Sequence, residues 1–129
     1  MMKPFSSEYA KIWEDEKGII HAVFLEREDF SLPDAKKYLD SCVDLAKGRS
    51  KPVLVDVRAL TAATPGTGMF LLKDDKNAMI NKAVAVLINP INPLTSMLIS
   101  IVLKFQSPPF PIKIFKEEKL AIQWLEKFL

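Results

Sequence analysis

Two short apolar runs constrain the fold of this chain more than any other feature. Residues 53–57 read Val-Leu-Val-Asp-Val, and residues 83–88 read Ala-Val-Ala-Val-Leu-Ile. Both runs are nearly continuous in aliphatic and β-branched side chains, which is typical of strands that are buried on both faces of a sheet. We therefore expect two buried strands, and the segments around them decide the fold class.

A β-hairpin is expected before the first of these strands. Residues 8–14 alternate polar and apolar side chains, and residues 19–25 are rich in strand formers. Between them lies Asp-Glu-Lys-Gly, a turn in which Gly18 can adopt a positive φ. We expect His21, in the second strand, to be an exposed or edge residue, because no nucleophile or acidic partner for it is indicated.

The first expected helix begins at Ser31-Leu32-Pro33-Asp34 and ends at Gly48. Ser31 can cap the free N–H groups, proline is tolerated in the first turn, and glycine suits the C′ position. Its apolar face contains Cys42, which we expect to be a buried thiol that acts as a small hydrophobe. That face consists of Ala35, Tyr38, Leu39, Cys42, Val43 and Ala46.

Later segments also have helical patterns. We expect two short helices near residues 65–72 and 74–80, and a third long helix over residues 93–105 that begins after Asn92. A short strand at residues 112–115 precedes a last helix that starts at Glu117-Glu118. The apolar residues of that last helix are Leu120, Ala121, Trp124, Leu125 and Phe128.

Strands and helices alternate after the hairpin, so the later strands are expected to run parallel with right-handed crossovers. The predicted fold class is α/β, with a mixed sheet of about five strands. A length of 129 residues suits one domain spanning residues 1–129, and no repeat or linker divides it.

Composition excludes several classes of function. The net charge of +2 is too small to indicate nucleic acid or an anionic membrane. One cysteine and one histidine permit neither an internal disulfide nor a zinc site of Cys and His ligands, and we expect no cofactor. The lone cysteine, together with the lack of a secretory signal or of about 18 consecutive apolar residues, predicts a cytoplasmic protein.

Several local patterns, in this order and spacing, resemble the SpoIIAA-like (STAS-like) domains. The chain looks most like small bacterial proteins of this type that are described as STAS-like or CRAL-TRIO-like, and the resemblance covers about residues 8–127. The patterns are Tyr-Ala-Lys-Ile-Trp at 9–13 with Gly-Ile-Ile at 18–20, Pro-Val-Leu-Val-Asp-Val-Arg at 52–58, Lys-Ala-Val-Ala-Val-Leu at 82–87, and Pro-Pro-Phe-Pro-Ile-Lys-Ile-Phe at 108–115 with Ala-Ile-Gln-Trp-Leu at 121–125.

This resemblance implies a fold rather than an activity. Its best-understood members are anti-sigma-factor antagonists, which are phosphorylated on the serine of an Asp-Ser pair at a helix N-terminus. Here residues 56–61 read Asp-Val-Arg-Ala-Leu-Thr, with no such pair. Thr61, Thr64 and Thr67 match the region only loosely, so no phosphorylation site is carried over. The CRAL-TRIO relatives, which bind lipids, imply an apolar ligand site.

One apolar patch is the main candidate site. On the helix at 93–105, Ile99 and Leu103 fall opposite the core-facing residues, among polar neighbours. Residues 69–72 are four consecutive apolar side chains, which cannot all face the core. A second apolar stripe can be a subunit contact, a ligand site or a surface covered within the chain. The candidate interface or apolar ligand patch is Met69, Phe70, Leu71, Leu72, Ile99 and Leu103.

Asp56 is a second candidate, because ligands of open α/β sheets often bind at the carboxyl ends of strands. In the alternative reading, Asp56 caps local backbone N–H groups and Arg58 pairs with a carboxylate.

No set of residues resembles a catalytic site. We therefore expect a non-enzymatic protein-interaction or regulatory domain that forms a homodimer through the third helix and has an unidentified protein partner. The alternative is a domain that binds or senses a small apolar ligand, such as a lipid chain.

Overall fold

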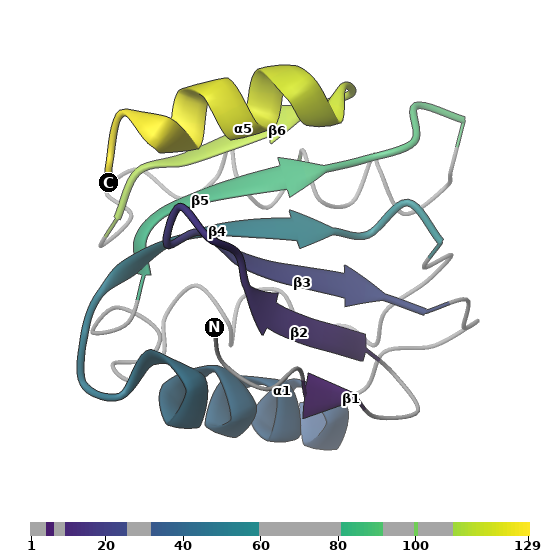
Figure 1. Cartoon of the computed structure of the whole chain (residues 1–129). Helices are drawn as coiled ribbons and strands as arrows, with labels where there is room; N and C mark the ends of the chain where they lie inside the picture. The colour runs from purple at the N-terminus through teal and green to yellow at the C-terminus, as the bar shows by residue number, and fades with distance from the viewer. Residues whose placement is uncertain (1–4, 7–9, 26–31, 60–80, 92–99, 101–109) are drawn as a thin grey trace.

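One six-stranded sheet organises the computed structural model, which describes residues 5–6, 10–25, 32–59, 81–91, 100 and 110–129 (Figure 1). The strands follow the sheet in the order in which they occur in the sequence, β1-β2-β3-β4-β5-β6. The elements are β1 (Phe5–Ser6), β2 (Ala10–Glu14), β3 (Ile20–Phe24), α1 (Leu32–Ala46), β4 (Lys51–Asp56), β5 (Asn81–Leu87), β6 (Ile112–Phe115) and α5 (Glu118–Glu126).

The sheet is mixed, as the alternation of strands and helices predicts. β2 is antiparallel to β1 and β3, whereas β3, β4, β5 and β6 are parallel to one another. The five expected strands correspond to β2–β6. The two-residue β1 was not predicted, because so short a segment has no detectable periodicity.

The first core layer lies between the sheet and α1. Alternate residues of β2–β6 point to this side, as the two-residue period of a strand requires. On β5 these are Val84 and Val86, and Ile88 continues the alternation just beyond the strand. Cys42 is buried in this layer, as predicted.

The second core layer lies on the opposite side of the sheet, where α5 packs on β4, β5 and β6. Figure 1 shows α1 and α5 on the two sides of the sheet. The other set of alternate β5 residues, Ala83, Ala85 and Leu87, meets Ala121 and Leu125 of α5. Covered strands on both faces explain why β4 and β5 are nearly continuous apolar runs.

Leu120, an apolar residue of α5, lies outside the second layer. Leu120 has the helical spacing of the apolar face of α5, yet 49% of it is exposed. Ala121 and Leu125 are the buried residues of this helix, and Ile122 packs against the same layer from a partly exposed position. The buried stripe is therefore rotated from Leu120 towards Ile122.

Several predictions lie outside the described residues. These are the short helices expected at 65–72 and 74–80 and, apart from Ser100, the helix expected at 93–105. No helix in the described part of the chain is long and apolar enough to span a bilayer.

Candidate functional site

None of the apolar patch residues predicted from the sequence is described by the structure. Met69, Phe70, Leu71, Leu72, Ile99 and Leu103 lie in the ranges 60–80, 92–99 and 101–109. Thr61, Thr64 and Thr67 lie there too. The patch stays a prediction, and the site below is built from other residues.

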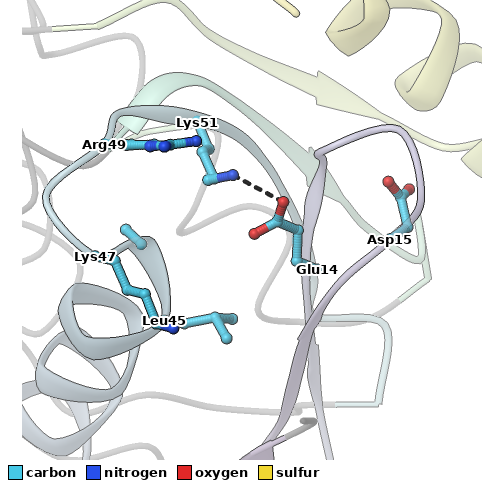
Figure 2. Close-up of a pocket in the computed structure, with 7 residues that line it drawn as sticks. Glu14, Asp15, Leu45, Lys47, Arg49 and Lys51 are labelled. Carbon is cyan, nitrogen blue, oxygen red and sulfur yellow. Dashed lines mark hydrogen bonds and ion pairs between the residues drawn. The ribbon is translucent and has the colours of Figure 1, made fainter. Parts of the chain in front are cut away.

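A pocket of about 350 Å³ opens beside the C-terminal end of α1 (Figure 2). Three segments that are far apart in the sequence meet there: the end of β2, the end of α1, and the start of β4 with the loop before it. Leu45 and Ala46, both nearly buried, give the pocket an apolar part. Its charged lining residues are Glu14, Asp15, Lys47, Arg49 and Lys51.

Glu14 and Lys51 form an ion pair across the pocket. The Lys51 Nζ atom lies 2.8 Å from the Glu14 Oε2 atom, and the side chains are only 16% and 17% exposed. This pair links the last residue of β2 to the first residue of β4. A short, partly buried contact of this kind is a charge-assisted hydrogen bond, so each side chain largely neutralises the other.

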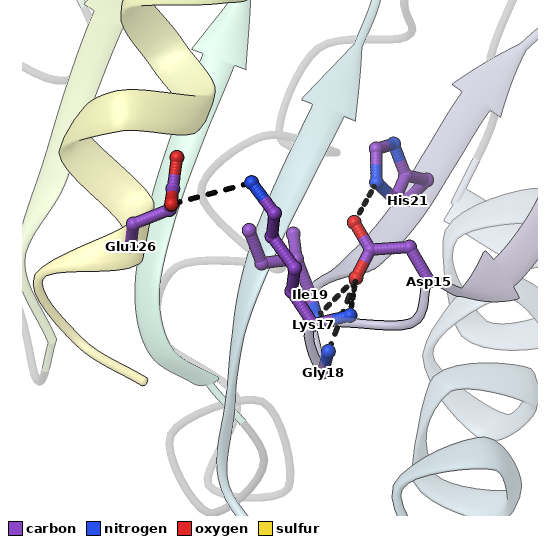
Figure 3. Close-up of polar contacts among 6 residues, drawn as sticks. All are labelled: Asp15, Lys17, Gly18, Ile19, His21 and Glu126. Atoms are coloured by element: carbon purple, nitrogen blue, oxygen red, sulfur yellow. Dashed lines mark hydrogen bonds and ion pairs between the residues drawn. The ribbon is translucent and has the colours of Figure 1, made fainter.

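Asp15 closes the turn between β2 and β3 (Figure 3). Its Oδ1 atom accepts hydrogen bonds from the backbone N–H groups of Lys17, Gly18 and Ile19, at 2.9, 3.1 and 3.0 Å. Gly18 has the predicted positive φ, at 99°. The Asp15 side chain therefore provides an acceptor for three N–H groups of the tight turn, and its backbone carbonyl also accepts from the N–H of Gly18, at 3.1 Å.

The other oxygen of Asp15 contacts His21. The Nε2 atom of His21 lies 2.8 Å from Asp15 Oδ2, and a carboxylate can only accept, so Nε2 carries the proton. Burial acts to raise the pKa of Asp15. The hydrogen bonds from His21, Ile19 and Lys17 and the charge of His21 outweigh it and hold that pKa below its ordinary value of 3.8.

The prediction that His21 is an exposed or edge residue is wrong. β3 is an interior strand, so His21 is not at an edge, and its side chain is only 13% exposed. Its ring stacks on Trp13 of β2, with centroids 5.0 Å apart and planes 6° apart. The acidic partner was missed because the turn brings Asp15 back beside His21, six residues away in the sequence. An aspartate that opens a tight turn was the available signal.

Lys47 and Arg49 are the remaining cations of the pocket. Both are exposed, and no hydrogen bond or ion pair joins their side chains to another described residue. Lys47 also has a left-handed backbone, with φ 52°, and Gly48 follows at 79°. Gly48 was predicted to end the helix, but the left-handed backbone begins one residue earlier, at a lysine.

At the carboxyl end of β4, the side chains of Asp56 and Arg58 form an ion pair that also includes a backbone hydrogen bond. Asp56 Oδ1 accepts hydrogen bonds from the backbone N–H and the Nε–H of Arg58, both at 3.0 Å. Arg58 Nη2 donates to Asp56 Oδ2 at 2.8 Å and lies 3.8 Å from Glu118 of α5. The reading in which Asp56 caps the backbone and pairs with Arg58 is confirmed.

The thiol of Cys42 is chemically protected. Burial raises its pKa to about 12, and a contact with Tyr38 only partly opposes this.

Among the residues that the structure describes, no group of three or more His, Cys, Asp or Glu side chains could hold a metal ion. The lining of the pocket combines charged and apolar groups, and Lys47 and Arg49 carry the charges that no other described residue pairs.

Comparison with known proteins places the chain in a family. Residues 12–129 match DUF7793, a domain of unknown function, and no curated protein matches the chain. The fold is similar to the crystal structure of an uncharacterised protein from the DUF3478 family, with a SpoIIAA-like fold, from Shewanella loihica PV-4. The two have 19% sequence identity and a TM-score of 0.60, over 90% of this chain and 91% of that one. The α/β class and the SpoIIAA-like architecture are thereby confirmed, and the chain belongs to the DUF7793 family.

Proposed function

We propose that this protein is a non-enzymatic regulatory domain of STAS-like type, which acts by binding other molecules. The observation that carries this proposal is that three partly or fully buried carboxylates all make structural contacts. Asp56 is held by Arg58, Asp15 by the β2–β3 turn and His21, and Glu14 by Lys51. A general base must be poised beside a nucleophile, whereas these carboxylates hold strands and turns together.

The binding we propose is self-association, with an additional protein partner. It is supported by the sequence of residues 93–105, where Ile99 and Leu103 form a second apolar stripe on an otherwise polar helix face. Residues 69–72 extend the same apolar character. A cytoplasmic location, suggested by the lone cysteine, is part of this proposal.

Native mass spectrometry of the purified protein tests it, because one measurement reports both assembly and bound small molecules. We expect a dimer without added mass, which Leu103→Asp converts to monomer. A charge in an apolar interface is desolvated without a partner, so the dimer should weaken by several kcal/mol, on the order of 3.

Ser100→Asp is the matched control, because Ser100 is exposed and lies in the same segment. Retention of the dimer in this variant, with circular dichroism like that of the wild type in both, would support the proposal. A wild-type monomer with no added mass would contradict it. Added mass of lipid size that is lost on denaturation would replace it with the apolar-ligand alternative.

A further inference from the structure

The charges around the pocket at the end of α1 do not cancel. Three of its lining residues are cationic and two are carboxylates. Lys51 is paired with Glu14 at 2.8 Å, and both oxygens of Asp15 already accept hydrogen bonds from the β2–β3 turn and from His21. The two charges left over, on Lys47 and Arg49, have the same sign. They border the same cavity without a counter-ion among the described residues.

The backbone at Lys47 adds an independent observation. A left-handed φ of 52° is unfavourable for a residue with a Cβ atom, and glycine usually takes this position at a helix end. Glycine is used at the next residue, Gly48, but not here. Backbone strain that persists at the rim of a cavity points to a role for the side chain it carries.

The uncharged lining and the size define the rest of the ligand. Leu45 is 6% exposed and Ala46 1%, so together they offer a narrow apolar strip rather than an open surface. A volume of about 350 Å³ lies at the lower end of the range of small-molecule sites. Figure 2 shows Lys47 on the α1 side of this space, with Arg49 in the loop before β4 and Lys51 at the start of that strand.

We propose that this pocket binds a small molecule that carries a phosphate or carboxylate oxyanion next to an apolar group. Lys47 and Arg49 hold the oxyanion, since an ammonium and a guanidinium together donate to several of its oxygens. Leu45 and Ala46 contact the apolar group. This binding does not depend on self-association, so either proposal can fail alone.

The position of the pocket separates this site from the Asp56–Arg58 pair. Lys51 is the first residue of β4 and Asp56 is the last, so the pocket and the Asp56–Arg58 pair lie at opposite ends of this strand. Ligands of open α/β sheets usually bind at the carboxyl edge. The proposed site lies at the amino end of β4, so it is inferred from its lining residues and not from that general rule.

Phenyl phosphate is a suitable probe, because it joins an oxyanion to an apolar ring. We would titrate it into ¹⁵N-labelled protein in a phosphate-free buffer of constant ionic strength, and follow backbone amide signals by NMR. We expect saturable shifts at residues 14–15 and 45–51. Lys47→Gln and Arg49→Gln should each weaken binding about tenfold or more, because each removes charge-assisted hydrogen bonds.

Lys119→Gln is the matched control, since it removes the same charge from an exposed position of α5, on the other side of the sheet. Lys47→Gly separates a ligand role from a structural one: it should raise the melting temperature, because it relieves the left-handed backbone, and still weaken binding.

Benzoate, inorganic phosphate and benzyl alcohol distinguish the sources of affinity. If phenyl phosphate binds more tightly than benzoate, the natural ligand carries a phosphate. If the two bind equally, the pocket accepts either a phosphate or a carboxylate. Binding of benzyl alcohol as tight as that of phenyl phosphate would overturn the proposal. So would the absence of saturable shifts, or equal affinities in Lys47→Gln, Arg49→Gln and Lys119→Gln.

Discussion

At the scale of single residues, Cys42 and Asp15 show opposite effects of their surroundings on a titrating group. Cys42 lies on the buried face of α1, where burial raises its pKa to about 12. Asp15 is partly buried too, but the hydrogen bonds it accepts stabilise its charged form more than burial disfavours it. The difference between them is the number of donors within reach.

The environment of Cys42 predicts that the thiol is inert in the folded protein. Only the thiolate attacks alkylating reagents, and at pH 8 a thiol with a pKa near 12 is almost wholly protonated. We expect iodoacetamide to leave the native protein unmodified and to add one label in denaturant, as measured by intact mass. Comparable labelling rates in the two conditions would show that Cys42 is accessible.

Asp15→Asn tests the turn through its pH dependence. The pKa of Asp15 is lower in the folded protein than in the unfolded chain. Its negative charge therefore stabilises the fold at any pH above the pKa of the unfolded chain. That stabilisation is lost as the pH falls through the lower pKa of the folded protein. Asparagine keeps an oxygen for the turn but loses the charge. We expect about 1 kcal/mol less stability at pH 7 and a smaller difference at pH 3, measured by urea denaturation.

Asp44→Asn is the control for that measurement, because Asp44 is exposed on α1. The same loss of stability at both pH values for Asp15→Asn would mean that hydrogen-bond geometry, and not charge, explains the role of Asp15.

At the scale of elements, sequence patterns predicted what each segment is more reliably than what it touches. The strands expected at 53–57 and 83–88 are found as β4 and β5, because so uniformly apolar a short run is typical of a strand that is covered on both faces. The exposure of Leu120 could not be read from the sequence, because helical spacing defines a face but not where the covering strands end. His21 was misplaced because its environment depends on the register between β2 and β3.

The pocket was missed for a related reason. The basic segment from Lys47 to Lys51 is visible in the sequence, but such segments are usually solvated turns. Only the placement of β2 next to β3, and of β3 next to β4, brings Glu14 to Lys51 and encloses the space between them. The left-handed backbone of Lys47 has no sequence signal, because glycine is the residue usually expected there.

At the scale of the whole molecule, two helices on opposite faces make the stability of the sheet depend on both. Leu125 of α5 is fully buried against the sheet, on the side that α1 does not cover. We expect Leu125→Ala to lower the free energy of unfolding by about 2–5 kcal/mol, because it removes apolar contacts and leaves a cavity. Urea denaturation followed by circular dichroism measures this loss.

Gln123→Ala provides the comparison, since Gln123 is exposed on the same helix. A loss below about 1 kcal/mol for Leu125→Ala, similar to that of an exposed position, would show that α5 contributes little to the second layer.

The sequential strand order also bears on how the chain acquires its structure during synthesis. Each strand from β2 onwards pairs with the strand made just before it, so each of these strands has a partner as soon as it is translated. The short connections between β1 and β2 and between β2 and β3 favour early pairing, whereas each parallel neighbour is reached over 24 or more residues of chain. The face that α5 covers is the exception: Leu54, Ala85 and Leu87 are translated well before Ala121 and Leu125 reach them. On the ribosome, this apolar face is therefore the surface that a chaperone would meet.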